Sequence, residues 1–466
     1  MGHRGRVRCP SRSSLPVLTL VLAVALAVLP GLAGTASAAA PAITLAAPAA
    51  AAGASTSLTV TVADEGAPVP GASVDVERWD GAAWQPVTGS PVVAGADGRA
   101  AVDLVVDRAP ARNRVRASYD GVTGEHQLTI RPVATRTTIT ARSAIVDGRR
   151  MYLRMDWRTT AGDPVPAGKV VLQRRLDGRW RTVGTFTTNE AGWARVLLRP
   201  RVDSRFRAIG HGNAWAQRSI SATHLIDNRP PGVPVRLPAG APSPRVRLPA
   251  QARASTAGAD AVVTAIPAGV WNSMVGRSWH RGCPVGRSGL RLLRINYWDY
   301  HGYRRRGELV AAAGVVHQMA GALAEMYAAR LPIRSMYRVD RFGWSGRLQG
   351  ADDYRSMAAG NSSAFNCRWV VGRGGVRSPH SYGRSLDINT WENPYRSSHG
   401  WVPNAWWPSR SNARVAWRSS RHQVVRIMAR HGLRWTYGNG DSQHFDAVPR
   451  HGRLLVVPGC EGVVCH

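Results

Sequence analysis

Residues 378–387 read SPHSYGRSLD, and a second short motif, DSQH, runs far downstream from Asp441 to His444. Together the motifs offer the imidazoles of His380 and His444 and the carboxylate of Asp387. Such groups are donors that a catalytic zinc ion takes while its fourth position stays open for water. Asp441 precedes His444 by three residues and could take a proton from that water. The motifs therefore predict a hydrolytic zinc site.

The residues around these donors predict a loop that leads into a strand. Residues 385–389 alternate between polar and apolar side chains, so Leu386 and Ile388 are expected in a core and Asp387 on the opposite side. Gly383 permits a sharp bend between a loop histidine and a strand carboxylate. On spacing alone the three-donor interpretation stays open, because most of the 14 histidines are expected at the surface or in ordinary hydrogen bonds.

These motifs resemble those of the zinc D-alanyl-D-alanine carboxypeptidases and L-alanyl-D-glutamate endopeptidases, the peptidoglycan peptidases of vancomycin-resistance and phage-endolysin type. The family's first motif, S-x-H-x-x-G-x-A-x-D, is matched by Ser378, His380, Gly383 and Asp387. Its closing motif, (D/E)-x-x-H-(F/W), is matched by Asp441, His444 and Phe445. Secreted bacterial members are also similar at residues 271–274, 283–285, 307–309, 361–368 and 393–395, so that the resemblance covers residues 262–450.

The resemblance implies that His380, Asp387 and His444 bind Zn²⁺ and that Asp441 is the general base. It also implies an α+β catalytic domain with the hedgehog-like fold of the zinc D,D-peptidases, at residues 259–466. The substrate would be a peptidoglycan stem peptide, and the bond cut stays open between D-alanyl-D-alanine and L-alanyl-D-glutamate or cross-links. The alternative hypothesis is a non-catalytic cell-wall-binding protein with a degenerate peptidase fold.

Two further residues take roles from the resemblance, and two depart from it. Arg368 matches the arginine that stabilises the developing oxyanion, since guanidinium stays charged and offers several donors; an ordinary surface cation is the alternative. Ser378 could bind substrate or cap the turn before Pro379, and both stay open. Ser385 stands on the expected cleft side where the family usually has alanine, and Asp441 is one methylene shorter than the glutamate of the vancomycin-resistance type.

The amino terminus has the features of a signal peptide, assigned to residues 1–38. Four arginines precede an apolar run at residues 15–32, and Ala36-Ser37-Ala38 supplies the small residues of a cleavage site. A retained membrane anchor is the alternative, but proline and glycine interrupt the run. We therefore expect a secreted, extracellular protein associated with the cell wall, with no membrane span in the mature chain.

Removal of the signal peptide leaves four cysteines. An even number in an exported chain predicts disulfides rather than a cysteine metal site. We predict that Cys460 pairs with Cys465. Cys283 would then pair with Cys367 and tie the start of the catalytic domain to the segment that carries Arg368. The sequence alone is compatible with three pairings.

An internal repeat precedes the catalytic domain. Pro68-Val69-Pro70 recurs as Pro164-Val165-Pro166, and Gly98 is answered by Gly192. Short alternating segments punctuated by glycine, proline and aspartate predict β-strands in each copy. We expect two all-β immunoglobulin-like sandwiches, at residues 39–133 and 134–225. Their ligand stays open.

The segment after the repeats differs in composition. Residues 226–258 are rich in proline, alanine and arginine, which predicts a semi-rigid linker that buries no core. Beyond it, apolar residues recur at helical spacing between Leu309 and Tyr327, and again shortly before Gly432. This spacing predicts two amphipathic helices in the catalytic domain.

The formal net charge of the full chain is +32, and without the four signal arginines 57 cations face 29 acids, a net charge of +28. Such an excess attracts polyanions. No nucleic-acid recognition motif accompanies the charge, so nucleic acid is not expected as a partner. Anionic cell-wall polymers fit better, although the arginine content can also reflect base composition. The oligomeric state stays open.

Overall fold

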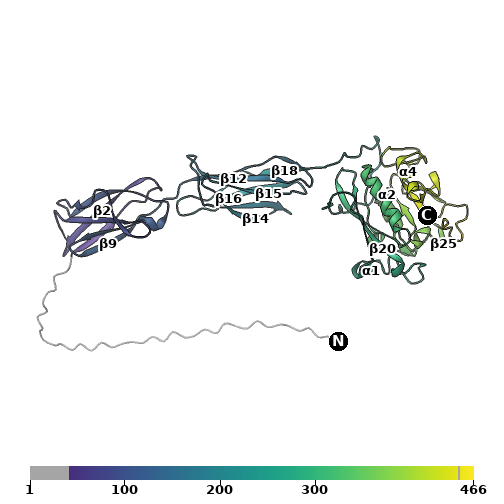
Figure 1. The fold of residues 1–466 in the computed structure, drawn as a ribbon, viewed down its shortest axis with the longest axis horizontal. Helices are drawn as coiled ribbons and strands as arrows, with labels where there is room; N and C mark the ends of the chain where they lie inside the picture. The colour runs from purple at the N-terminus through teal and green to yellow at the C-terminus, as the bar shows by residue number, and fades with distance from the viewer. Residues whose placement is uncertain (1–40, 450–451) are drawn as a thin grey trace, which may run out of the picture. The chain divides into compact units, whose positions relative to one another are not determined.

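The computed structural model describes residues 41–449 and 452–466 (Figure 1). The expected signal peptide therefore lies outside the described residues. The described chain is mostly β-sheet with few helices, and it falls into two compact units, which divide between Arg131 and Pro132. No helix within the described residues is long and apolar enough to cross a membrane.

The first unit is built from two antiparallel sheets. One sheet has the order β1-β2-β3 with β7 beside β2: β1 (Ala42–Ala46), β2 (Ser55–Asp64), β3 (Ala67–Pro68) and β7 (Arg99–Val105). The other has the order β5-β4-β8-β9 with β6 beside β4: β4 (Ser73–Trp79), β5 (Trp84–Pro86), β6 (Val92–Val93), β8 (Arg114–Tyr119) and β9 (Val122–Gln127). Alternate residues of β2 point inward, so Leu58 and Val60 pack in one core with Val74 and Val115 of the second sheet.

The second unit begins with two further sheets. One has the order β10-β12-β15: β10 (Thr135–Thr140), β12 (Met151–Thr159) and β15 (Trp193–Leu198). The other has the order β11-β18-β16-β13-β14 with β17 beside β16: β11 (Ala144–Val146), β13 (Lys169–Leu176), β14 (Arg179–Thr187), β16 (Ser204–Gly210), β17 (Ser219–Ile220) and β18 (His224–Arg229). All pairs are antiparallel except β11 with β18. Trp157 of β12 is fully buried in this part.

The sequence repeat corresponds to one backbone contact that occurs in both copies. Gly98 has φ +70°, and a Cβ on it would lie 2.6 Å from the Val62 carbonyl oxygen. Gly192 has φ +74°, and a Cβ on it would lie 2.9 Å from the Trp157 carbonyl oxygen. In each copy the glycine also lies against the first proline of the repeated Pro-Val-Pro. Each of the two positions therefore requires glycine for two reasons: the backbone is left-handed, and a neighbouring carbonyl group leaves no room for a Cβ.

We expect Gly98→Ala to destabilise the first unit more than Gly66→Ala, as measured by urea unfolding of the full chain. Gly66 also has positive φ, at +82°, but a Cβ there would meet nothing within 4 Å. Both changes carry left-handed strain of about 1–2 kcal/mol, and only Gly98→Ala adds overpacking of about 1–3 kcal/mol. Equal destabilisation by the two variants would contradict the close-contact explanation.

The C-terminal region, residues 259–466, holds the helices together with small antiparallel sheets. Its sheet strands are β19 (Val262–Ala265), β20 (Leu290–Trp298) and β21 (Arg304–Ala312); β22 (Trp344–Ser345) and β23 (Gly350–Ala351); β24 (Trp369–Val370) and β25 (Arg373–Arg377); β26 (Ser385–Asp387), β30 (His444–Ala447) and β29 (Leu433–Arg434); and β27 (Tyr395–Ser397) with β28 (Gly400–Val402). Its helices are α1 (Ala268–Met274), α2 (Val316–Ala328), α3 (Asp353–Ala358) and α4 (Gln423–Arg430). One core joins α2, α4, the β20–β21 hairpin and the β26–β30 pair, and Figure 1 shows α2 lying along β20.

The two predicted helices are present, but the first begins later than the apolar spacing predicted. Leu309 lies in β21, where it pairs with Leu293, and α2 begins at Val316. The β20–β21 hairpin takes up the earlier apolar residues, because its cross-strand pairing competes successfully with helical spacing. The second helix, α4, ends at Arg430 just before Gly432, as expected.

The expected linker differs from the prediction in two ways. Its first residues belong to β18, which continues to Arg229. The remainder has no helix or strand but is packed: Val246 and Leu248 lie against the cluster that contains Phe342, and the Trp391 indole N–H donates to the Pro242 carbonyl oxygen at 2.7 Å. Apolar side chains between the prolines find partners in the C-terminal region, which a composition argument cannot foresee.

Candidate metal centre

The pairing of β26 with β30 brings the two sequence motifs together. Asp387 and His444 are direct partners in this antiparallel pair. Leu386 and Phe445 are also partners, and both are fully buried in the main core of the region, as is Ile388. The predicted core positions of Leu386 and Ile388 are therefore confirmed. The same alternation turns Asp387 and His444 toward a common site.

His380 reaches this site from the short 3-10 helix η4 (Pro379–Tyr382). Gly383 ends η4 in the left-handed conformation, with φ 66°. A Cβ on Gly383 would lie 2.8 Å from the Ala312 amide nitrogen of β21. The bend that the sequence predicted at this glycine is present, and it lets the chain turn directly from His380 into β26.

The side chains of His380, Asp387 and His444 bring their possible metal-binding atoms close together. His380 Nε2 lies 3.1 Å from Asp387 Oδ2, and His444 Nδ1 lies 3.2 Å from Asp387 Oδ1. The two imidazole nitrogens are 3.1 Å apart. All three side chains are buried. Atoms bound to one zinc at about 2 Å in a tetrahedron are separated by little more than 3 Å, so the spacing suits a single ion.

The second nitrogen of each imidazole is already engaged. The His380 Nδ1–H group donates to the Ala364 carbonyl oxygen at 2.6 Å, and the His444 Nε2–H group donates to Asp446 Oδ1 at 2.9 Å. These bonds leave His380 Nε2 and His444 Nδ1 with free lone pairs that face Asp387. Such outer contacts hold metal-binding histidines in the required tautomer and orientation.

Asp446 is a site residue that sequence reasoning missed. Ser385 Oγ donates to its Oδ1 at 2.6 Å, and Thr436 Oγ1 donates to its Oδ2 at 2.7 Å. Ser385 lies on the same strand face as Asp387, as expected, and its fully buried side chain holds Asp446. The sequence could have indicated Asp446, because a residue two positions beyond His444 lies on the same face of a strand.

Arg368 lies in the interior and is fully buried, which excludes the surface-cation alternative. Its Nη1–H donates to the Trp369 carbonyl oxygen at 3.1 Å. Its Nη2 lies 2.9 Å from Asp353 Oδ2, an ion pair without hydrogen-bond alignment. Its Nε has no hydrogen-bond partner among the described residues. The guanidinium thus keeps N–H donors available inside the protein.

Asp441 is fully buried, and its two carboxylate oxygens differ in their surroundings. Oδ2 lies 3.1 Å from Nδ1 of His466, the last residue of the sequence. Oδ1 has no hydrogen-bond partner within the described part of the chain. His466 is a second residue that the sequence did not single out, because no spacing or motif connects it with the other donors.

The buried carboxylates and the neighbouring histidines shift one another's pKa values. Burial alone raises the pKa of Asp387, but the charges of His380 and His466 outweigh it and hold that pKa well below its usual range. Burial lowers the pKa of His444, yet neighbouring carboxylates raise it well above normal. The carboxylates of Asp441 and Asp387 likewise raise the pKa of His466 to about 9 despite burial. A divalent cation would take the place of these protons, so the two nitrogens and one carboxylate fit Zn²⁺.

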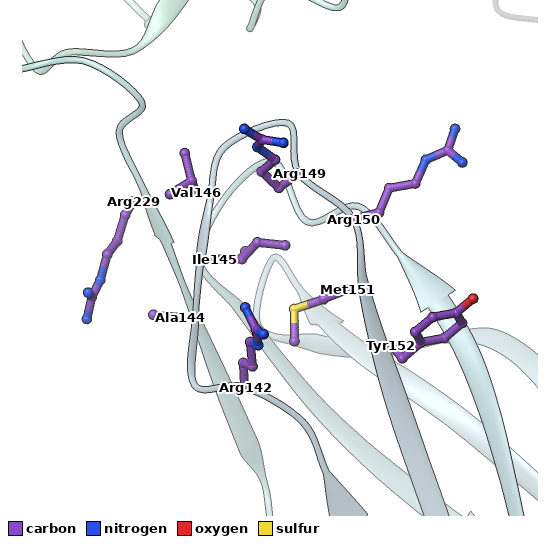
Figure 2. A pocket seen from close by; sticks show the side chains of 9 residues that line it. All are labelled: Arg142, Ala144, Ile145, Val146, Arg149, Arg150, Met151, Tyr152 and Arg229. Atoms are coloured by element: carbon purple, nitrogen blue, oxygen red, sulfur yellow. The ribbon is translucent and has the colours of Figure 1, made fainter.

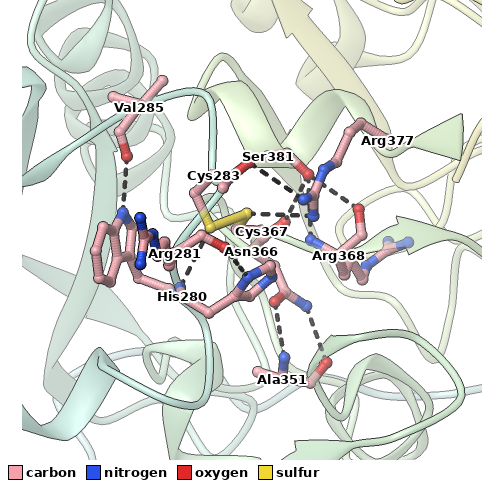
Figure 3. The surroundings of a disulfide bond; sticks show 12 residues. His280, Arg281, Cys283, Val285, Ala351, Asn366, Cys367, Arg368, Arg377 and Ser381 are labelled. Carbon is pink, nitrogen blue, oxygen red and sulfur yellow. Dashed lines mark hydrogen bonds between the residues drawn. A yellow bond between two sulfur atoms is a disulfide. The ribbon is translucent and has the colours of Figure 1, made fainter. Parts of the chain in front are cut away.

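Ser378 and the cysteines support the loop that carries Arg368 and His380. The Ser378 side chain is fully buried and accepts from the His380 amide, which is the capping contact; substrate binding by Ser378 stays a prediction. The predicted disulfides, Cys283–Cys367 and Cys460–Cys465, are both present. Figure 3 shows the first disulfide directly beside Arg368, where it anchors that segment.

A basic pocket lies in the sheets that begin the second unit. Arg142, Arg149, Arg150 and Arg229 line it, around the apolar side chains of Ile145 and Met151 (Figure 2). Arg229 also pairs with Asp227 at 3.1 Å on the exposed surface. Binding of anionic cell-wall polymers, which the net charge suggested, stays a prediction for which this pocket is a candidate place.

A family model described as D-alanyl-D-alanine carboxypeptidase matches residues 371–447. The matched segment contains the three convergent donors and Asp441, whereas Arg368 precedes it and His466 follows it. This match supports a peptidoglycan peptidase. The two disulfides and a cell-wall peptidase match together favour an extracellular protein. The search of curated proteins found no match.

Two solved structures are similar to parts of the chain. The sulfur carrier protein SoxY from Chlorobium limicola f thiosulfatophilum has 9% identity, covers 20% of this chain and 77% of its own, and gives a TM-score of 0.15. The D0-D1 domain of intimin has 14% identity, covers 40% of this chain and 98% of its own, and gives a TM-score of 0.16. At such TM-scores neither similarity bears on the fold or the function.

We expect Asp446→Ala to weaken zinc binding by about 10- to 100-fold, because the change frees the His444 ring from its outer partner. Asp446→Asn keeps an acceptor oxygen and should lose less. Asp177→Ala, at an exposed loop carboxylate of the second unit, is the control. The measurement is a Zn²⁺ titration against a competing chelator. Unchanged affinity in Asp446→Ala would show that this carboxylate does not orient His444.

Proposed function

We propose that the C-terminal region hydrolyses an amide bond in peptidoglycan stem peptides with a bound Zn²⁺ ion. The observation that carries the proposal is the convergence of His380 Nε2, His444 Nδ1 and the Asp387 carboxylate, with the second nitrogen of both imidazoles already engaged. The match of residues 371–447 to a carboxypeptidase family model supports the substrate class.

The residues around the donors supply the remaining steps. His380, Asp387 and His444 would hold the zinc ion, which would supply polarisation of the scissile carbonyl and a water that is nucleophilic at neutral pH. Asp441 accepts the water's proton through Oδ1, the oxygen without a hydrogen-bond partner among the described residues, and returns it to the leaving amine. Arg368 donates to the carbonyl oxygen as negative charge develops on it. Because the site is buried, these charges act in a medium that screens them weakly.

The bond that is cut stays open. The shorter Asp441 carboxylate resembles the endopeptidase branch, which favours L-alanyl-D-glutamate or a cross-link over strict carboxypeptidase action. The alternative of a degenerate, non-catalytic wall-binding protein is disfavoured, since the three donors, the carboxylate of Asp441 and the buried Arg368 are all in place.

The rest of the chain fits an enzyme that works at the cell wall. We propose that residues 1–38 direct export, that the two pairs of sheets are immunoglobulin-like sandwiches, and that they present the C-terminal region to its substrate. The excess of positive charge would favour contact with anionic wall polymers.

We expect His380→Ala and His444→Ala each to weaken zinc binding by more than the 10- to 100-fold typical of an outer partner, because each change removes a donor to the ion itself. His399→Ala, at an exposed histidine outside the cluster, should bind zinc like the unaltered chain. Zinc content after dialysis, measured by mass spectrometry, distinguishes them. Full zinc retention in both donor variants would refute the assigned ligand set.

We expect Asp441→Asn to keep zinc while hydrolysis of purified sacculi falls by about 100- to 10,000-fold, the usual worth of a general base. The amide matches the carboxylate in size, so thermal stability should change little. Mass spectrometry of the released fragments measures the rate and identifies the bond. If Asp441→Asn loses its zinc, Asp441 is a ligand; if it hydrolyses normally, another group takes the proton.

A further inference from the structure

His466 is buried next to the candidate metal centre, and its side chain is only 1% exposed. Its Nε2 lies 3.1 Å from Asp353 Oδ2, and its Nδ1 lies 3.1 Å from Asp441 Oδ2. The ring stacks on Tyr395, with 4.2 Å between ring centroids and 25° between planes. Both nitrogens and one ring face therefore have partners.

The imidazole also lies within the donor set. A ligand atom of His466 and those of His380, Asp387 and His444 all lie within 4.8 Å of one another. Its Nε2 is 3.9 Å from Asp387 Oδ2. Catalytic zinc sites use three protein donors and leave one position for water, whereas sites with four protein donors are closed. A fourth protein donor from His466 would therefore take the position that the water needs.

The same ring engages the groups that turnover needs. It holds one carboxylate oxygen of Asp441, the proposed base. It also bonds to Asp353 Oδ2, the oxygen that lies 2.9 Å from Arg368 Nη2. His466 therefore contacts the proposed base directly and is linked to Arg368 through Asp353.

The segment that ends at His466 is held in place by a hydrogen bond, a disulfide and apolar contacts. The Val371 amide donates to the His466 carbonyl oxygen at 2.9 Å. Cys465, the preceding residue, is fully buried and bonded to Cys460, and both pack in a cluster with Val370 and Val457. These contacts offset the entropy lost when this segment is ordered.

We propose that His466 exchanges its Nε2 contact with Asp353 for the metal ion and becomes a fourth donor, while its Nδ1–H group stays on Asp441, and that residues 452–466, the closing segment, hold the site in a latent state. Displacement of the closing segment removes one nitrogen from the ion, frees Asp441, and opens the position for water. The inference rests on the proposed function for its consequence in hydrolysis, but the closure itself concerns only access to the metal.

The test uses the full chain loaded with Co²⁺, in which a ligand that enters the coordination sphere changes the visible spectrum. His466→Ala and His466→Gln remove the imidazole, and Gln keeps a polar group between the carboxylates should Ala disturb folding. Val463→Ala, at a side chain 40% exposed in the same segment, is the matched control. The probe is azide, a small anion that binds an open metal position.

We expect azide to change the spectrum of both His466 variants but not that of the unaltered chain or of Val463→Ala. With zinc bound, hydrolysis of sacculi should rise in the His466 variants, by about 100-fold if the closed form outnumbers the open form 99 to 1. Adding Asp441→Asn to His466→Ala should remove that gain, which would place the gain at the same site.

The outcomes separate the two proposals. If azide enters the unaltered chain as readily as the variants and the rates are equal, latency is refuted and the proposed function stands. If the variants admit azide but no chain hydrolyses sacculi, closure is supported and the proposed function fails. If the His466 variants keep their metal and hydrolyse more slowly than the unaltered chain, His466 assists the reaction and latency is again refuted.

Discussion

The antiparallel pairing of β26 with β30 is the constraint on which the candidate centre depends. It joins Asp387 to His444 across 57 residues of sequence and sets both on one face. Leu386 and Phe445 on the other face are buried in the core, and they fix the register, because a slip by one residue would turn apolar side chains into the site. The core therefore positions the donors as well as stabilising the fold.

The second constraint is the burial of charge. Asp353, Asp387 and Asp441 are all in the interior, where an unpaired carboxylate is strongly unfavourable. Each faces a cationic or metal-binding partner: Asp353 faces Arg368 and His466, Asp387 faces the imidazoles, and Asp441 faces His466. The closed arrangement gives each of these carboxylates a partner within the chain, although Asp441 Oδ1 has no hydrogen-bond partner among the described residues. An open arrangement needs an ion, water or substrate to do so.

Local chemistry explains what could be predicted. The Pro-Val-Pro repeat with its glycine marks a close backbone contact, so the two copies were visible from residue type and order. The strand alternation at Leu386 and Ile388 also follows from a local period. The start of α2 and the packing of the proline-rich segment were not predictable in this way, because each depends on partners distant in the chain.

The sequence by itself determined the motifs that carry His380, Asp387, Asp441 and His444, the even number of cysteines in the expected mature chain, and the repeat. These features are properties of residue type and spacing, and the family resemblance rests on the same properties. Only the tertiary structure decided that Asp446 and Ser385 support His444, that Arg368 is buried, and that His466 lies among the donors. Those contacts join segments with no common spacing, and they form because buried polar groups must find partners wherever the folded chain brings them together.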